Sequence, residues 1–271
     1  MIKKCIYVPL LFFFSNSAFA QISVIGELSQ DREVRPGEKY DGVILVKNDT
    51  NEPQEAKVYQ TDYSFHFSGT NNYGDPGTNP RSNARWVAFS PSFLTIPPQG
   101  TMAVNFTVAI PTDTAKKFAG TYWSMLMIEG IPKGSAESSV PPKDKKVQMG
   151  IMQNIRYGVQ IATLIAGTGD RKINFIDVPK IIRTNEGKRI LQIDIENIGD
   201  VGMRPEVYVE LFDEKGISKG KYPGNRYRIY PGTSVRQSID LTSIPQGTYK
   251  ALVVVDAGGD DIFGAQYTLK F

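Results

Sequence analysis

Few residues in this sequence could perform chemistry, and their spacing does not favour catalysis. His66 is the only histidine and Cys5 the only cysteine among the 271 residues. A zinc site needs several nitrogen or sulfur ligands, and a nucleophilic triad needs a histidine oriented by a partner. His66 lies in an alternating segment, which indicates a solvent-facing or strand-edge position. We therefore predict no catalytic residue, no metal site, no cofactor and no enzymatic activity.

Scattered acidic residues do not change this interpretation. Gly258-Gly259-Asp260-Asp261 lacks the spaced acidic ladder of a calcium loop, and it is more simply a hairpin turn. Pairs of carboxylates can hydrolyse glycosides, but nothing in the pattern brings two of them together.

The first twenty residues are typical of a cleaved secretory signal. Lys3 and Lys4 precede an apolar run from Ile6 to Phe14, and the segment closes on Ala18-Phe19-Ala20. Cleavage after Ala20 removes Cys5, so the mature chain enters an oxidising compartment without a disulfide. Its domains must then be stabilised by burial alone.

The charge balance argues against nucleic acid as a partner. The formal net charge is +3, and two of these charges are the lysines of the expected signal. A polyelectrolyte partner favours a strongly basic protein. After the signal no apolar run is long enough for a transmembrane helix, so we do not expect a membrane-spanning protein.

Short segments of period-two alternation dominate the rest of the sequence. Such alternation places one set of side chains on a buried face and the other set in water. The clearest apolar sets are Val104, Phe106 and Val108; Leu191, Ile193 and Ile195; and Val207, Val209 and Leu211. Many short strands with regular Pro-Gly turns predict an all-β fold of sandwiches.

A faint internal repeat predicts two domains. Gly120-Thr121-Tyr122 and Gly247-Thr248-Tyr249 each lead into an apolar strand, and Asn48 and Asn197 each end an earlier one. We predict immunoglobulin-like domains in tandem over residues 21–168 and 169–271, with the joint near Gly167 to Asp170. Residues 68–83 are polar and turn-forming, so we expect a mobile hairpin or crossover loop, and residues 133–146 form a basic loop.

The segment Val147 to Tyr157 follows this basic loop and carries the functional argument. Val147, Met149 and Ile151 alternate with polar or small residues, and the cation Arg156 lies near the end. Here the chain resembles the PapD-like periplasmic chaperones of pilus assembly. The strand Gly120 to Ile131, closing on Ile131-Pro132, resembles the strand that precedes it in that family. Asp31-Arg32, a Gly turn and a strand ending at Asn48 resemble the family's first strand.

This resemblance implies a periplasmic chaperone that caps incomplete immunoglobulin-like subunits of a surface fibre. Val147, Met149 and Ile151 would fill the client's groove by strand addition. Arg32 and Arg156 would bind the client's terminal carboxylate, since arginine suits charge-assisted bonds to carboxylates. The implied partners are pilin-like subunits and an outer-membrane usher, and the free strand at 147–157 could pair with a second copy.

Two alternatives stay open at this point. The 147–157 strand could face its own core, and strict alternation puts Arg156 on the opposite face from the three apolar residues. A different class of function is a structural or adhesive cell-surface protein, with residues 68–83 and Tyr73 as its contact site.

Overall fold

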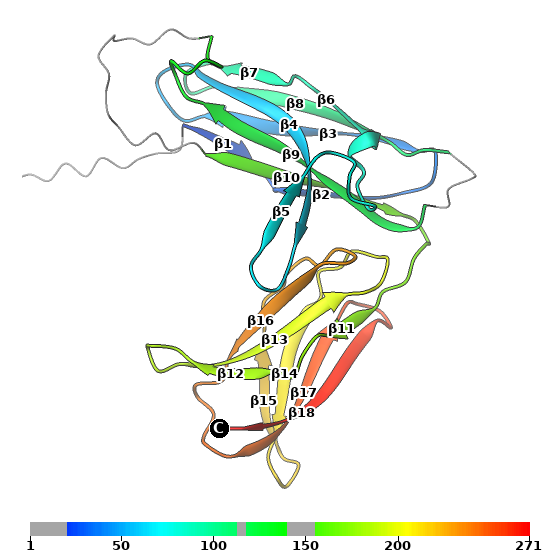
Figure 1. Ribbon diagram of the computed structural model, residues 1–271, viewed down its shortest axis with the longest axis vertical. Coiled ribbons are helices and arrows are strands. Elements are labelled where there is room, and N and C mark those ends of the chain that lie inside the picture. The colour runs from blue at the N-terminus through cyan, green and yellow to red at the C-terminus, as the bar shows by residue number, and fades with distance from the viewer. Residues whose placement is uncertain (1–20, 113–117, 140–154) are drawn as a thin grey trace, which may run out of the picture.

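The computed structural model describes residues 21–112, 118–139 and 155–271. Its strands form four sheets arranged as two β-sandwiches, which lie one above the other in Figure 1. This confirms the predicted all-β fold with two immunoglobulin-like domains. The expected signal, residues 1–20, lies outside the described residues, and so do Val147, Met149 and Ile151.

The first sandwich is built from β1 to β10. One sheet has the order β1-β3-β8-β6 and the other has the order β2-β10-β9-β4-β5, with β7 also paired to β4. Its strands are β1 (Ile22–Ile25), β2 (Ser29–Val34), β3 (Lys39–Asn48), β4 (Gln54–Phe65), β5 (Asn71–Gly74), β6 (Val87–Ser90), β7 (Phe93–Ile96), β8 (Thr101–Ala109), β9 (Gly120–Ile131) and β10 (Arg156–Ile165). A single 3₁₀ turn, η1 (Ala84–Trp86), precedes β6.

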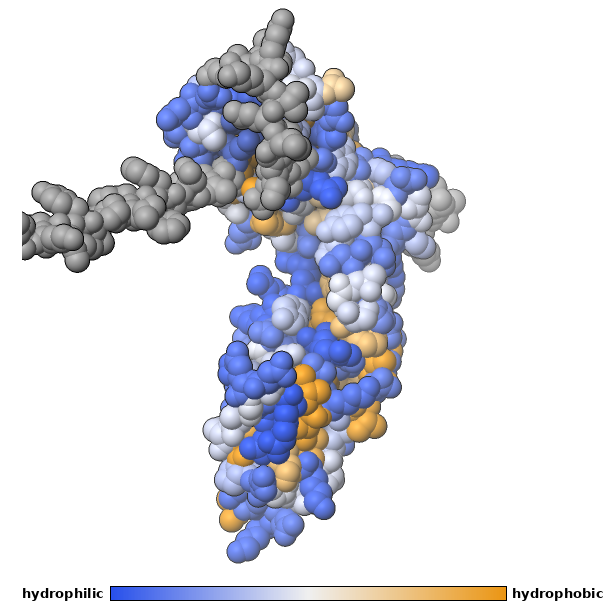
Figure 2. Space-filling model, turned by 60° about the vertical axis from the view of Figure 1, so that its left-hand side comes forward, coloured by the Kyte–Doolittle hydropathy of each residue, from blue (hydrophilic) through white to orange (hydrophobic). Residues whose placement is uncertain are grey.

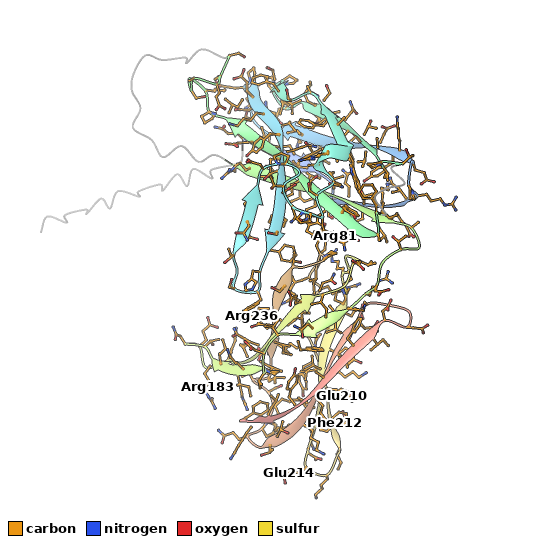
Figure 3. All side chains as sticks on the ribbon, turned by 45° about the vertical axis from the view of Figure 1, so that its right-hand side comes forward. Arg81, Arg183, Glu210, Phe212, Glu214 and Arg236 are labelled. Carbon is orange, nitrogen blue, oxygen red and sulfur yellow. The ribbon has the colours of Figure 1, made fainter. Side chains whose placement is uncertain are left out.

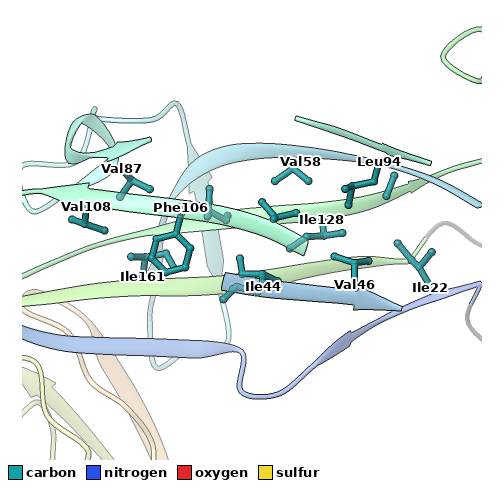
Figure 4. Packing of buried hydrophobic residues seen from close by; sticks show 14 of the residues in the cluster. Ile22, Ile44, Val46, Val58, Val87, Leu94, Phe106, Val108, Ile128 and Ile161 are labelled. Carbon is teal, nitrogen blue, oxygen red and sulfur yellow. The ribbon is translucent and has the colours of Figure 1, made fainter. Parts of the chain in front are cut away.

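The core of this sandwich lies between the two sheets. The alternating apolar residues of each strand point inward and meet those of the facing sheet, as Figure 4 shows for Ile44, Phe106 and Ile128. The predicted set Val104, Phe106 and Val108 is buried in β8. Burial of such side chains stabilises the fold by roughly 1.5–3 kcal/mol each.

The second sandwich is built from β11 to β18. In one sheet β13 pairs with β11, β12 and β16, and the other sheet has the order β15-β14-β17-β18. Its strands are β11 (Ile173–Phe175), β12 (Lys180–Arg183), β13 (Arg189–Asn197), β14 (Glu206–Phe212), β15 (Ser218–Pro223), β16 (Ser234–Asp240), β17 (Thr248–Asp256) and β18 (Ile262–Lys270). The sets predicted to be buried in β13 and β14 lie in its core.

The internal repeat corresponds to one structural motif that occurs in both sandwiches. Asn48 is buried at the end of β3, where its amide donates to the carbonyls of Ile96 and Pro97 at 3.1 and 3.0 Å. Asn197 is buried at the end of β13, and its amide donates to the carbonyls of Val201 and Ile229 at 2.8 and 3.1 Å. Each asparagine fixes the turn after its strand, because a buried amide needs partners for its polar atoms.

The outer surface is mostly hydrophilic on the face shown in Figure 2, with hydrophobic residues gathered over the second sandwich. Exposed apolar side chains of the second sandwich include Ile198, Ile217 and Ile262. Within the described ranges, no helix has the length and apolar character that a membrane crossing requires.

Candidate functional site

Strand β10 links the predicted client-binding segment to the body of the first sandwich. It is antiparallel to β9 over its whole length, with Arg156 opposite Glu129 and Ile165 opposite Gly120. Val159 and Ile161 are fully buried in the core. Because side chains alternate, Arg156 and Gly158 lie on the outer face of the sheet.

The first part of β10 has an open edge. Strand β2 pairs with β10 in parallel from Gln160 to Ile165, and no described residue pairs with that edge at positions 156–159. The reason is the path of the chain: β1 pairs with β3 in the other sheet, and the chain crosses between the sheets before β2 begins.

The direction of the free main-chain groups follows from the neighbouring bonds. The amide of Gln160 donates to the carbonyl of Leu28 at 2.9 Å, on the β2 side. Main-chain groups of alternate residues in a strand point to the same side. The N–H and C=O groups of Arg156 and Gly158 therefore point to the open edge, where an added strand could bind them.

The outer face beside this edge is hollowed into a cavity of about 510 Å³. Strands β4, β9 and β10 supply its floor and β5 contributes Tyr73 to its wall. Its lining residues are Tyr59, Thr61, Tyr73, Met125, Met127, Arg156 and Gly158. The lining is thus mixed: two methionine thioethers lie beside one guanidinium and the hydroxyl groups of threonine and tyrosine.

Arg156 is part of a polar chain at the rim of this cavity. A hydrogen bond to the hydroxyl of Tyr59 raises the pKa of the Arg156 guanidinium, and the nearby charges of Tyr59 and Glu129 act in the same direction. The Tyr59 hydroxyl in turn donates to Glu129 at 2.9 Å. Lys57 lies 4.0 Å from the same carboxylate. Arg156 is exposed, so its remaining N–H groups can reach a ligand.

The structure does not bring Arg32 and Arg156 together. Arg32 lies in β2 opposite Thr163, seven positions along β10 from Arg156, which corresponds to roughly 23 Å at about 3.3 Å per residue. Arg32 also shares a face of β2 with the buried Val34, whereas Arg156 is on the outer face. One carboxylate cannot contact both guanidinium groups in this arrangement.

Arg32 lines a hollow of about 300 Å³ at the junction with the second sandwich, together with Arg228 and Tyr230. It also lines a separate groove between the edges of the two sheets. This groove has a volume of about 360 Å³ and includes Gln30, whose side-chain amide donates to the carbonyl of Val43 at 3.1 Å. It lies beside four exposed apolar side chains: Ile25, Leu28, Val43 and Leu45. A client-binding role for Arg32 stays a prediction, and any such contact involves a different part of the client from the one at Arg156.

The junction between the sandwiches contains a site that the sequence did not reveal. The rings of Trp123 in β9 and Tyr230 in the second sandwich are stacked, with centroids 4.4 Å apart and planes 5° from parallel. Tyr230 is fully buried, donates to Gln160 at 2.8 Å and has its pKa raised by desolvation. Phe65 packs against the same pair.

Two ion pairs also join the two sandwiches. Arg228 binds Asp31 through both guanidinium amino groups, one of them at 2.7 Å, and Arg81 pairs with Asp200. Figure 3 shows Arg81 at the junction and Arg236 beside the tip of the β4–β5 hairpin. No short motif marks these pairs, because their members are far apart in the sequence.

Residues 68–83 include the second strand of a hairpin, which is one of the two forms that the sequence predicts for this segment. Residues 71–74 form β5, which pairs with β4 in a hairpin that reaches toward the second sandwich (Figure 1). At its tip the amide of Phe67 donates to the hydroxyl of Ser234 at 3.1 Å, and Arg236 lies over the Phe67 ring. The following turn wraps around the buried Asp62, whose carboxylate accepts from the amides of Thr78 and Asn79 at 2.8 and 2.7 Å.

His66 occupies the turn of this hairpin. It is exposed, and its Nδ1 lies 2.9 Å from the hydroxyl of Ser68, so the solvent-facing position that the sequence indicates is confirmed. No group of three or more histidine, cysteine, aspartate or glutamate side chains that could hold a metal ion occurs among the residues that the structure describes.

Comparison with known proteins gives matches in structure only. No family model and no curated protein matches the sequence. Among solved structures, a chain of the chaperone–tip adhesin complex of CFA/I fimbriae biogenesis is 16% identical with a TM-score of 0.48, covering 92% of this chain and 98% of that one. The class 5 fimbriae chaperone CfaA is 15% identical with a TM-score of 0.46, covering 91% and 98%.

A third neighbour is the CsuC–CsuE chaperone–tip adhesion subunit complex of archaic Csu pili from Acinetobacter baumannii. It is 10% identical, with a TM-score of 0.47, and the match covers 91% of this chain and 98% of that one. The structural neighbours over nearly the full length are thus chaperones of pilus assembly. Fold alone does not fix function, so the functional argument below rests on the geometry of β10.

Proposed function

We propose that this protein is a periplasmic chaperone that binds incomplete immunoglobulin-like fibre subunits and caps them before assembly at an outer-membrane usher. The observation that supports this proposal most directly is the open edge of β10 at residues 156–159. An exposed edge with free main-chain groups is a template for strand pairing, and folded proteins usually cover or interrupt such edges.

In this proposal the segment before β10 continues the open strand into the client. Val147, Met149 and Ile151 enter the groove of the subunit, where a missing strand leaves its core incomplete. Burying one such side chain fully contributes roughly 1.5–3 kcal/mol, before the cost of ordering the segment is subtracted. Arg156 binds the client's terminal carboxylate and so sets the register, while Arg32 contacts the client at the other end of β10.

The test is capture of a co-expressed subunit. The triple variant Val147→Ser, Met149→Ser and Ile151→Ser, carrying a C-terminal affinity tag, is purified from the periplasm together with a small signal-bearing subunit encoded beside its own gene. We expect the variant to fold but to lose the subunit. The matched control replaces three exposed hydrophobic residues of the second sandwich, Ile198, Ile217 and Ile262, by serine.

The control should retain the subunit at the level of the unmodified protein. Full capture by the triple variant refutes strand addition by this segment. The single variants Arg156→Ala and Arg32→Ala then test the contribution of each arginine. If both variants capture the subunit at full yield, neither arginine binds the client.

A further inference from the structure

The last strand of the second sandwich has one side that pairs with no described residue. β18 is antiparallel to β17 along its whole length, and it ends the sheet order β15-β14-β17-β18 (Figure 1). We propose that this edge binds β18 of a second copy of the chain in antiparallel orientation, so that two four-stranded sheets become one continuous sheet. The inference goes beyond the proposed function and does not depend on it, since the client-binding edge lies on the first sandwich.

The direction of the free main-chain groups of β18 follows from one hydrogen bond. The amide of Phe271 donates to the carbonyl of Gly247 at 3.0 Å, on the β17 side. Main-chain groups of alternate residues point to the same side of a strand. The residues whose N–H and C=O groups point to the free edge are therefore Ile262, Gly264, Gln266, Thr268 and Lys270. Antiparallel pairing centred on Gln266 gives each of them a partner, with about ten hydrogen bonds.

The opposite edge of the same sheet is protected against pairing, whereas β18 is not. β15 carries Lys219, Lys221 and Pro223, and a bulge interrupts its pairing with β14. Lysine, proline and bulges are devices by which folded proteins prevent edge-to-edge pairing. β18 contains no proline, its register with β17 is continuous, and its only charged residue is Lys270 at its end. This sheet thus blocks an added strand at one edge and accepts one at the other.

The charges at the two ends of β18 favour a second copy as the partner. Asp256 and Asp260 lie at the end where β18 begins, and the exposed Lys250 and Lys270 lie at the end where it finishes. In an antiparallel pair with two-fold symmetry, the acidic end of each copy faces the basic end of the other. A parallel pair would bring like charges together. The edge is therefore complementary to itself in one orientation.

The side chains along the free edge also suit this pairing. Ile262 is 59% exposed, and with Gln266 on the two-fold axis it faces the partner's Lys270, whose methylene chain can cover it. Gly264 faces the partner's Thr268, and a glycine in a strand permits the close approach of another main chain. Pairing thus shields an exposed hydrophobic residue as well as satisfying main-chain groups.

Sedimentation equilibrium of the mature chain over a range of concentrations tests the inference. We expect a reversible equilibrium between monomer and dimer. Because Gln266 faces its own symmetry mate, Gln266→Lys should weaken dimerisation roughly fivefold, the order expected for like charges directly opposite each other in paired strands. Gln266→Glu should have the same effect. The matched control Ile217→Lys adds the same charge at an exposed position of the same sandwich and should leave the dissociation constant unchanged.

An equimolar mixture of the Gln266→Lys and Gln266→Glu variants should form a heterodimer that is tighter than either homodimer. This gain would also show that both variants are folded. Gln266→Pro removes a main-chain donor on the free edge without removing a bond to β17, so the variant should keep its circular dichroism spectrum and stay monomeric.

The inference is refuted if the unmodified chain is monomeric at every concentration at which it stays in solution. It is also refuted if the variants at Gln266 dimerise normally, or if the mixture shows no gain. Dimerisation that persists in these variants but is lost when residues 147–151 are substituted would place the contact on the first sandwich, and would overturn the inference while leaving the proposed function intact.

Discussion

The stacked pair at the junction leads to a quantitative prediction about how the two sandwiches are held together. Tyr230 is fully buried between Trp123, Ala162 and Phe65, although it belongs to the second sandwich. Truncating a buried aromatic residue to alanine costs about 3–5 kcal/mol. Within that total, the stacked rings contribute about 0.5–1.5 kcal/mol beyond area burial.

We therefore expect Tyr230→Ala to lower the free energy of unfolding by about 3–5 kcal/mol. Tyr230→Phe keeps the stack and loses only the hydrogen bond to Gln160, so it should cost about 1 kcal/mol. Tyr227→Ala, at a position 43% exposed in the same segment, is the matched control and should change stability by less than about 0.5 kcal/mol.

The assay is guanidinium chloride unfolding followed by tryptophan fluorescence. The chain has two tryptophans, and one of them, Trp123, is half of the stacked pair. Small-angle X-ray scattering on the same variants reports whether the sandwiches separate, and Tyr230→Ala should increase the radius of gyration. If Tyr230→Ala has no larger effect than Tyr227→Ala in either measurement, the stack does not hold the junction together.

Two further substitutions test other parts of the first sandwich. Gly120 has a φ of +74°, and an added Cβ would overlap the Asp200 carbonyl oxygen, so Gly120→Ala should strongly lower the stability of the protein in thermal unfolding. The control Gly258→Ala has a φ of +89° but open space around the added Cβ, so it should cost only about 1 kcal/mol. Asp62→Asn removes two of the acceptor lone pairs that hold the turn at residues 75–82, so limited proteolysis should cleave that turn faster than in the unmodified protein; equal cleavage rates would show that the carboxylate does not order it.

The strands and the repeat could be predicted because they depend on short-range patterns. Alternation at Leu191, Ile193 and Ile195 identifies a buried strand without any knowledge of its partner. The turns after Asn48 and Asn197 could be predicted because the side chain of each asparagine accepts a hydrogen bond from the amide two residues later. Interactions of this kind join residues that are close together in the sequence.

The candidate site could be predicted only in part because it depends on which strands become neighbours. The sequence places Arg156 at the end of an alternating segment, but its relation to Arg32 depends on where β2 begins to pair with β10. The position of Met125 and Met127 beside Gly158 likewise depends on the register of β9 against β10, which the alternation of residues does not reveal. Composition alone does not place the β4–β5 hairpin beside the second sandwich, since the contact of Phe67 with Ser234 joins segments far apart in the chain.

The aromatic junction has a consequence for the order in which this chain folds during translation. The last described strand of the first sandwich, β10, ends at Ile165, so this sandwich can close while Tyr230 has still to be synthesised. Trp123 and Phe65 then lack the ring of Tyr230, which packs against both of them in the full chain. Apolar surface that is exposed for a time on a growing chain is a target for holding factors and for aggregation. A fragment ending after β10 therefore carries this aromatic surface permanently, and the full chain conceals it only when its second half has folded against it.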